Sequence, residues 1–346
     1  MAQAFSVRIP HEDKIMNIDN ARELKSSLLG NVTASLAKPA AIRSLGVRAR
    51  EFDPGKDAMR TMAIGITTDG KDHKLAIRLQ RRALEDHPVL TKIRQRAKGE
   101  VDIKYVGRIQ KLETPTALQK RRRPLVIGCS IGHFKITAGT LGCFVKDRAT
   151  GEVLILSNNH VLANENSAKT GDRIIQPGKV DGGKLTTDTI GQLQRFIKLK
   201  KTGTNFVDCA VASIKSTINS NQRKLGSFGN IAGLGPAVVL DGTDVRKVGR
   251  TTGETKGRVT AFELDNVVIG YDLGDLRFDD QIEIEGAGSK AFSDGGDSGS
   301  LIFDKQLGAV ALLFAGGDEG GSNGMGLTYA NPIRAVLDAL KVDLVV

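Results

Sequence analysis

Asp294–Ser300, with the sequence DGGDSGS, runs directly into the apolar residues LIF at positions 301–303. A serine between glycines on a tight turn, just before a buried strand, can present its hydroxyl while neighbouring backbone N–H groups stay free to hold an oxyanion. Ser298 therefore has the setting of a nucleophile, with the N–H groups of Gly296 and Ser298 as the predicted oxyanion hole. Because Gly, Asp and Ser also make ordinary turns, the motif alone leaves a purely structural turn open.

Two further segments extend this pattern towards the N-terminus. Val153–Ala163 (VLILSNNHVLA) is an apolar strand that runs into His160, and 205–212 (NFVDCAVA) places Asp208 inside an otherwise apolar run. A charge in an apolar strand is costly unless it has a partner, and an imidazole N–H is a suitable one. The order His, Asp, Ser predicts that these three residues act together.

The segments SNNHVLA, VDCA and GDSGS, in this order and spacing, resemble the trypsin-like (chymotrypsin-fold) serine peptidases. Within that family the chain looks most like the bacterial intracellular branch, also seen in plant NARROW LEAF-type proteins. The resemblance covers about residues 125–346. It implies a mainly β fold, a chymotrypsin-like double β-barrel with a C-terminal helix. It also implies a serine endopeptidase with His160, Asp208 and Ser298 as catalytic triad, and neither cofactor nor metal.

Substrate binding follows from the same resemblance. A polypeptide substrate would be held as an added strand along Phe314, Ala315 and Gly316, because main-chain pairing presents the scissile bond in register. The floor of the specificity pocket would lie six positions before the serine, at Phe292, next to Ser293. Trypsin-like specificity needs an acidic residue there, so we predict a preference for small or apolar side chains.

Asp297 raises the question of activation. In secreted relatives the aspartate before the serine pairs with an N-terminal amine that cleavage releases, whereas here 124 residues precede Leu125. Either an internal donor pairs with Asp297, or cleavage within Lys120–Arg123 releases the amine. Pro124 disfavours cleavage after Arg123, and we favour the internal donor.

From residue 125 the sequence has short apolar strands separated by Gly, Asn and Asp turns, as in an all-β barrel. Residues 140–145 and 153–156 frame a turn and predict a hairpin that ends near His160. The glycine-rich, basic stretch 245–259 lacks the helix start of a phosphate loop and is interpreted as a hairpin. Residues 331–340 predict a terminal helix that begins at Pro332.

The three cysteines favour a reducing compartment. Cys129, Cys143 and Cys209 are an odd number without paired spacing, which predicts free thiols. Secreted relatives carry a cysteine directly after the catalytic histidine, where this chain has Val161, and the first residues lack the apolar core of a secretory signal. We therefore expect a cytoplasmic protein without a membrane segment. Cys129, His133 and Cys143 lack a fourth ligand at metal spacing, so no zinc site is predicted.

Residues 1–124 form the predicted N-terminal domain, a basic α/β unit with a regulatory or partner-binding role. They hold 26 Lys and Arg against 14 Asp and Glu, while the whole chain has a net charge of +11, so the excess positive charge is N-terminal. The basic run Lys120–Arg123 is a solvated linker, a processing site, or a contact for an acidic protein or nucleic acid. No aromatic residues interleave it, which makes nucleic acid a minor hypothesis.

The elements of this domain follow from local patterns. We predict strands over 61–68, 74–79 and 101–106, a helix from Pro88, and a helix from Asp19-Asn20 to Leu29 that Gly30 ends. Nothing in this β-β-α-β unit has the composition of an active site.

Two other classes of function remain open from sequence. One is a catalytically silent peptidase fold that binds peptides, and the other is an effector recruited by its basic N-terminal domain. The sequence leaves the substrate and the oligomeric state undetermined.

Overall fold

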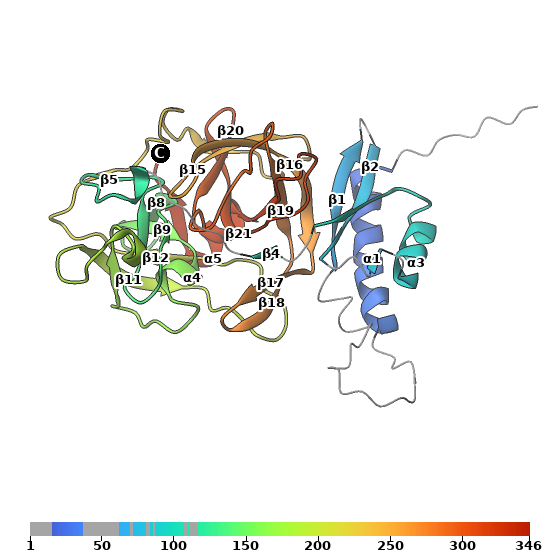
Figure 1. Cartoon of the computed structure of the whole chain (residues 1–346), viewed down its shortest axis with the longest axis horizontal. Coiled ribbons are helices and arrows are strands. Elements are labelled where there is room, and N and C mark those ends of the chain that lie inside the picture. The colour runs from blue at the N-terminus through green and yellow to red at the C-terminus, as the bar shows by residue number, and fades with distance from the viewer. Residues whose placement is uncertain are drawn as a thin grey trace, which may run out of the picture.

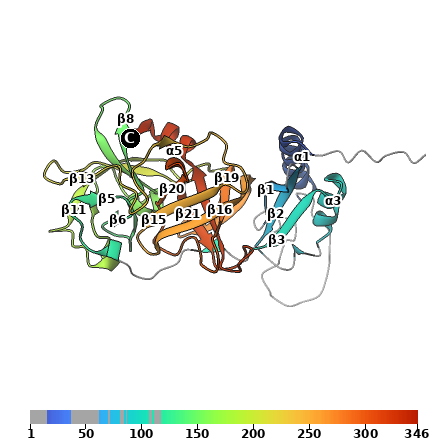
Figure 2. The ribbon, with the colours of Figure 1, turned by 90° about the horizontal axis from the view of Figure 1, so that it is seen from above.

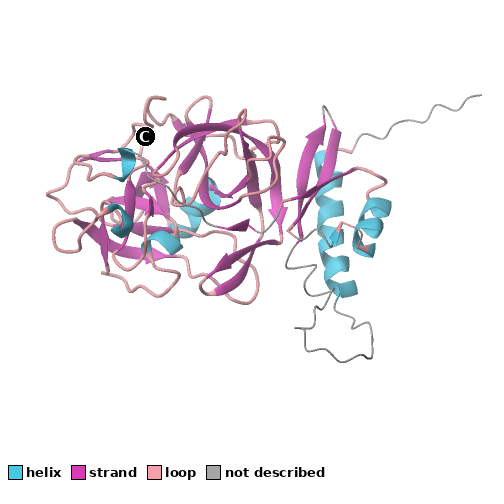
Figure 3. Ribbon diagram, viewed as in Figure 1, coloured by secondary structure: helices cyan, strands magenta, loops and turns pink. Residues whose placement is uncertain are grey.

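The computed structural model of the chain describes residues 16–36, 62–69, 72–80, 84–85, 87–106, 109–110 and 117–346. Figure 1 shows a large β region and, beside it, a small unit of strands and helices. The mainly β class predicted from the sequence is confirmed, and Figure 3 shows how few helices the large region contains.

The first barrel is an eight-stranded sheet that curves as a half-barrel. Its strands, in spatial order, are β23 (Val342–Leu344), β8 (Cys143–Asp147), β9 (Val153–Ser157), β12 (Ala210–Ala212), β11 (Thr189–Phe196), β10 (Arg173–Ile175), β6 (Ser130–His133) and β7 (Gly139–Thr140). The predicted hairpin before His160 is confirmed, since β8 and β9 pair antiparallel. Short elements border this barrel: β5 (Leu125–Val126) paired with β13 (Ser220–Asn221), and the 3-10 turns Ala117–Gln119 and Lys179–Asp181.

The second barrel is closed by six strands. They are β15 (Asp244–Gly249), β20 (Leu301–Asp304), β21 (Gly308–Gly317), β22 (Leu327–Pro332), β19 (Gln281–Gly286) and β16 (Gly253–Asp265). The β15–β16 pairing closes the ring and confirms the hairpin predicted for 245–259. At its margins, β14 (Gly233–Leu234) pairs with β21, and β17 (Val267–Tyr271) pairs with β18 (Gly274–Phe278) as a separate hairpin.

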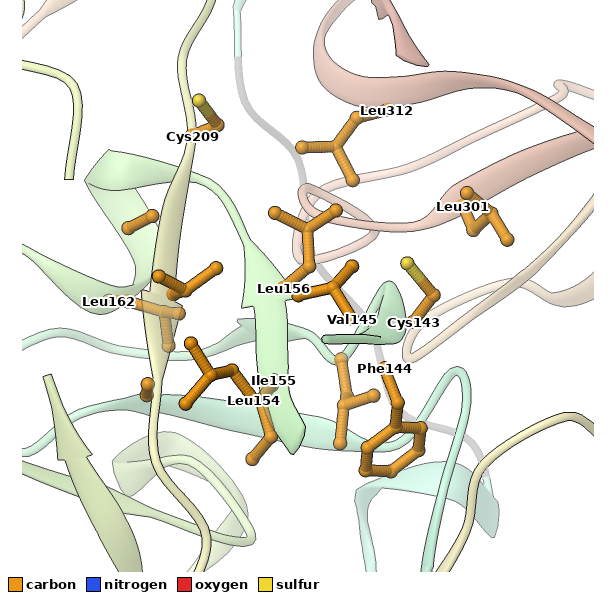
Figure 4. Close-up of a cluster of buried hydrophobic side chains, with 14 of the residues drawn as sticks. Cys143, Phe144, Val145, Leu154, Ile155, Leu156, Leu162, Cys209, Leu301 and Leu312 are labelled. Carbon is orange, nitrogen blue, oxygen red and sulfur yellow. The ribbon is translucent and has the colours of Figure 1, made fainter. Parts of the chain in front are cut away.

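The main core lies in the first barrel and against the neighbouring strands β20 and β21. Consecutive apolar side chains of β8 and β9 are buried, and Figure 4 shows Cys143 and Leu156 on the side of Leu301 and Leu312 from the second barrel. Helix α5 (Ile333–Leu340) covers this core with its apolar stripe, so the predicted terminal helix is confirmed. The three cysteines are buried with free thiols, and burial raises the pKa of Cys143 to about 12.

The small unit consists of helices α1 (Ile18–Leu36) and α3 (Pro88–Arg96) and strands β1 (Met62–Asp69), β2 (Asp72–Leu79) and β3 (Val101–Tyr105). The helices lie on the side of the strands that faces away from the barrels, as Figures 1 and 2 show. The predicted β-β-α-β order is confirmed, except that Thr61 lies outside the described residues. The predicted end of the first helix is wrong: α1 continues through Gly30 to Leu36. One helical glycine costs only about 1 kcal/mol, which is too little to end a helix by itself.

The small unit is joined to the second barrel by a continuous sheet. The end of β16 pairs antiparallel with β1, so β1, β2 and β3 extend the barrel sheet. Arg78 in β2 is buried and donates to Glu283 of β19 at 2.8 Å, while its Nη1 reaches Asp102 at 2.9 Å. The N-terminal strands therefore share both hydrogen bonds and a buried ion pair with the barrel that carries Ser298. The division at residue 124 stays a prediction.

The basic segment before Leu125 lies on the first barrel. Gln176 donates to Lys120 O at 3.0 Å and accepts from the Arg122 N–H at 2.9 Å, and Arg121 Nε lies 3.1 Å from Asp188. The backbone of Lys120–Arg123 is thus fixed, while most of its side chains are exposed.

Candidate active site

His160 and Asp208 meet at the ends of two paired strands of the first barrel. His160 lies in the single-turn helix α4 (Asn159–Leu162), which begins two residues after β9 ends, and Asp208 lies two residues before β12, which pairs with β9. The pairing of these strands brings His160 Nδ1 to 2.5 Å from Asp208 Oδ2. Asp208 is fully buried, whereas His160 keeps 8 % of its surface exposed.

Every oxygen of the Asp208 carboxylate has hydrogen-bond donors. Oδ1 accepts the backbone N–H groups of Asn159 at 2.6 Å and His160 at 3.3 Å. Oδ2 accepts from His160 Nδ1 and from the Tyr271 hydroxyl at 2.7 Å. This saturation offsets the cost of burying the charge and fixes the orientation of the carboxylate towards the imidazole.

Tyr271 is a contact that the sequence analysis missed. It ends β17, and its ring meets His160 edge-on with centroids 5.9 Å apart. Burial, and then the Asp208 charge, raise the pKa of Tyr271 well above its ordinary value, so the hydroxyl stays protonated and donates. No local pattern marks this residue, because the contact joins positions 63 residues apart.

Ser298 lies on the turn before β20, next to the helix that carries His160. Thr140 N donates to Ser298 O at 2.8 Å, and a β-carbon added at Gly139 would lie 2.4 Å from Val161 and 3.1 Å from Ser298 O. Gly139 thus lets the two segments approach closely. No hydrogen bond joins Ser298 Oγ to His160 Nε2 in the described structure, and such bonds often form only when substrate binds.

The N–H groups of the serine turn divide into two sets. In the turn Asp294–Ser300, five N–H groups donate within the fold, those of Asp294, Gly295, Asp297, Gly299 and Ser300. The N–H groups of Gly296 and Ser298 have no acceptor among the described residues. These are the two donors that the sequence assigned to an oxyanion.

Gly296 has a positive φ of 86° and packs against a buried guanidinium. A β-carbon at this position would lie 2.0 Å from Arg250 Nη1, so both the backbone conformation and the space require glycine. Arg250 is held by two 2.7 Å hydrogen bonds to Asp181 and is 2 % exposed. The fixed guanidinium of Arg250 therefore packs directly against the backbone of the serine turn at Gly296.

Asp297 has an internal cationic partner. Lys247 Nζ lies 3.1 Å from Asp297 Oδ2, and both side chains are fully buried. The carboxylate also accepts from Thr252 Oγ1 at 2.7 Å and from the Thr251 N–H at 2.8 Å. Burial alone would raise the pKa of Asp297, but the Lys247 charge and these donors hold it below its usual value. Burial lowers the pKa of Lys247.

Of the predicted substrate-binding residues, Phe292 lies in the core of the second barrel, whereas the other four lie on or beside β21. Phe292 is 1 % exposed, and its ring packs in the core of the second barrel, 5.9 Å from Lys247 Nζ. Ser293 Oγ lies 2.6 Å from Thr328 Oγ1 and close to Gly316. Phe314 and Ala315 are buried in β21. The roles of all five residues in specificity stay predictions.

The described residues contain no group of three His, Cys, Asp or Glu side chains placed to hold a metal ion. Among them there is also no helix both long and apolar enough to cross a membrane.

Comparison with solved structures finds proteases that are similar to part of this chain. Thermobifida fusca protease A is similar with a TM-score of 0.44 and 17% identity, covering 64% of this chain and 98% of that one. A Nocardiopsis protease is similar with a TM-score of 0.45 and 17% identity, covering 64% of this chain and 99% of that one. A Cellulomonas bogoriensis chymotrypsin is similar with a TM-score of 0.43 and 19% identity, covering 64% of this chain and 98% of that one. No family model and no curated protein matches the chain.

The closed six-stranded barrel, the half-barrel and the C-terminal helix of this chain confirm the predicted fold class. In this fold the serine turn belongs to the second barrel and the His–Asp pair to the first. The site therefore lies where the two barrels meet.

Proposed function

We propose that the chain is a serine endopeptidase that uses Ser298, His160 and Asp208. The observation that carries this proposal is the His160 Nδ1–Asp208 Oδ2 contact of 2.5 Å. A carboxylate that accepts the Nδ1 proton leaves Nε2 of the neutral imidazole as a base, on the ring edge away from Asp208. The two free N–H groups of the serine turn support the same chemistry.

The reaction would proceed through an acyl-enzyme. Ser298 Oγ attacks the peptide carbonyl carbon while its proton passes to His160 Nε2. The N–H groups of Gly296 and Ser298 stabilise the resulting oxyanion, where the loss of one donor typically costs about 2.7–4 kcal/mol. His160 then gives the proton to the leaving amine, and a water molecule hydrolyses the ester by the same route.

The Lys247–Asp297 pair supports a site that needs no new N-terminus. A buried amine already neutralises Asp297, and its neighbours Thr251 and Thr252 fix the same carboxylate. We therefore propose that the uncleaved chain has a formed oxyanion turn, which is the internal-donor alternative of the sequence analysis.

The setting of the activity is also a proposal. We propose an intracellular protein substrate, because Val161 follows His160 where secreted relatives have a bridged cysteine. By the same resemblance we assign the chain to the bacterial intracellular branch. The N-terminal unit, through its β1–β16 pairing, is in a position to regulate the site.

Tyr271 is proposed as a positioning residue for His160 and Asp208. We expect Tyr271→Phe to slow labelling of Ser298 by a small fluorophosphonate about tenfold, because Asp208 loses one charge-assisted donor. The variant should also shift the downfield proton resonance of His160 Nδ1–H, which a merely structural change would leave in place. Tyr329→Phe is the matched control, since its buried hydroxyl donates to Glu283 instead. Equal rates and resonances in Tyr271→Phe and wild type would refute this role.

The proposed function is tested with a library of peptides derived from a digested proteome. Incubation with the protein should create new peptide termini, identified by mass spectrometry, with small or apolar residues before the cut. Ser298→Ala should create none. A wild-type protein that creates no new termini, or an alanine variant that creates the same ones, would contradict peptidase activity.

A further inference from the structure

The strand edge assigned to substrate is occupied by the chain itself. Strand β4 (Ile109–Gln110) pairs antiparallel with the end of β21, with Gly316 opposite Gln110 and Gly317 opposite Ile109. The pairing overlaps at Gly316 with the edge along Phe314, Ala315 and Gly316 that the sequence predicts to bind substrate.

The geometry of β21 explains why this edge accepts a strand. Strand β22 pairs with one side of β21 from Ala311 to Gly317. On the other side, β20 pairs only as far as Leu312. Leu313 still exchanges backbone hydrogen bonds with Gly299 and Ser300, and beyond Leu313 the strand β4 takes the place beside β21, at Gly316 and Gly317.

The direction of β4 leads towards the serine turn. Because the pairing is antiparallel, the step from Ile109 to Gln110 runs from Gly317 back along β21. Leu313, four residues before Gly317, exchanges hydrogen bonds with Gly299 and Ser300 of the turn. An extended peptide laid in the place of β4 would therefore point its C-terminal side at Ser298.

The N-terminal unit holds the segment that leads to β4. Val106 donates its N–H to Leu79 O at 2.8 Å, at the end of β2. Its side chain is 1 % exposed, in one cluster with Phe314 and Leu327 of the second barrel. β4 also lies beside β17, the strand that ends at Tyr271, and Figure 1 shows it between β21 and the β17–β18 hairpin.

We propose that Ile109–Gln110 is a built-in pseudosubstrate that occupies the substrate-binding edge and inhibits the chain in cis. The proposal rests on the proposed peptidase function. Because β4 is tethered, its pairing is intramolecular, and short tethers give effective concentrations in the millimolar range. A polypeptide substrate must displace it, whereas a reagent that contacts only Ser298 and the oxyanion hole need not.

The test compares two kinds of active-site reagent on the full-length chain. One is a small fluorophosphonate, and the other is a set of tripeptide phosphonates that end in alanine, leucine, phenylalanine or lysine. The variant carries Ile109→Pro and Gln110→Pro, which remove both backbone donors of β4. The matched control carries Ile109→Ala and Gln110→Ala, which keep them.

We expect the double-proline variant to react about tenfold faster with the best tripeptide phosphonate, at an unchanged rate with the fluorophosphonate. The alanine control should match wild type with both reagents. A synthetic peptide of residues 104–111 should slow the tripeptide reaction of the proline variant again. If the double variant does not fold, Gln110→Pro alone is compared with Gln110→Ala.

Two negative results have different meanings. If the fluorophosphonate labels all variants but the tripeptide rate does not rise, β4 is no inhibitor and the proposed function stands. If neither reagent labels any variant, the proposed function is wrong and the inhibitory role of β4 falls with it.

Discussion

Asp208→Asn is expected to lower the rate of Ser298 acylation about 10⁴-fold, the size of effect found when a triad aspartate becomes an amide. The reason lies in the four donors around this carboxylate. Two backbone N–H groups face Oδ1, while His160 Nδ1 and the Tyr271 hydroxyl face Oδ2. An asparagine must turn its NH2 group towards one of these pairs.

Either orientation harms the site. An NH2 group facing the backbone donors leaves buried N–H groups unpaired, which costs stability. An NH2 group facing His160 favours the tautomer with the proton on Nε2, and that nitrogen can then no longer accept the serine proton. The measurement is the second-order rate constant for fluorophosphonate labelling.

Asp172→Asn is the matched control for this substitution. Asp172 lies 3.1 Å from His133 Nε2, so the first barrel contains a second His–Asp pair away from the serine turn. We expect the control to label at the wild-type rate. A rate within tenfold of wild type for Asp208→Asn would contradict the role assigned to the carboxylate.

Lys247→Met is expected to lower the free energy of unfolding by about 3–5 kcal/mol. The substitution leaves the Asp297 carboxylate fully buried without its cation, and removing one partner of a buried pair has this cost. The turn that carries Ser298 should lose its fixed geometry as well, so labelling should slow. Urea unfolding monitored by circular dichroism measures the first effect.

Two further variants separate the effect of the unpaired Asp297 charge from the loss of a single neighbouring side chain. Thr252→Val removes the hydroxyl that donates to the Asp297 carboxylate and accepts from Lys247 Nζ, but it keeps the ion pair and should cost less, about 1.5–3 kcal/mol. Lys247→Met combined with Asp297→Asn leaves no unpaired buried charge and should recover part of the stability. A loss below 1 kcal/mol in Lys247→Met would mean that Asp297 does not depend on this lysine.

The sequence predicted the fold class because its patterns are local and periodic. Apolar strands between turn residues indicated a barrel, and Pro332 with the apolar stripe of α5 indicated the last helix. The pairing of β9 with β12 follows from their apolar character, and it brings His160 to Asp208 as expected.

Long-range contacts were harder to predict. Lys247 lies in a hairpin that was predicted correctly from the sequence. Residues two apart in a strand face the same side, so the apolar Val245 was a signal that the Lys247 side chain points inward. Tyr271 reaches Asp208 through the fold of a separate hairpin. A two-residue strand such as β4 has no periodicity at all, so only the completed barrel edge reveals its place.

The site of covalent labelling tests most directly whether Ser298 is an activated nucleophile. Full-length protein is treated with a small fluorophosphonate, and the adduct is mapped by peptide mass spectrometry beside Ser298→Ala. We expect one adduct per chain, on Ser298, formed without cleavage near Lys120–Arg123 and absent from the alanine variant. An unlabelled wild-type chain, or an adduct that persists in Ser298→Ala, would contradict an activated serine at this turn.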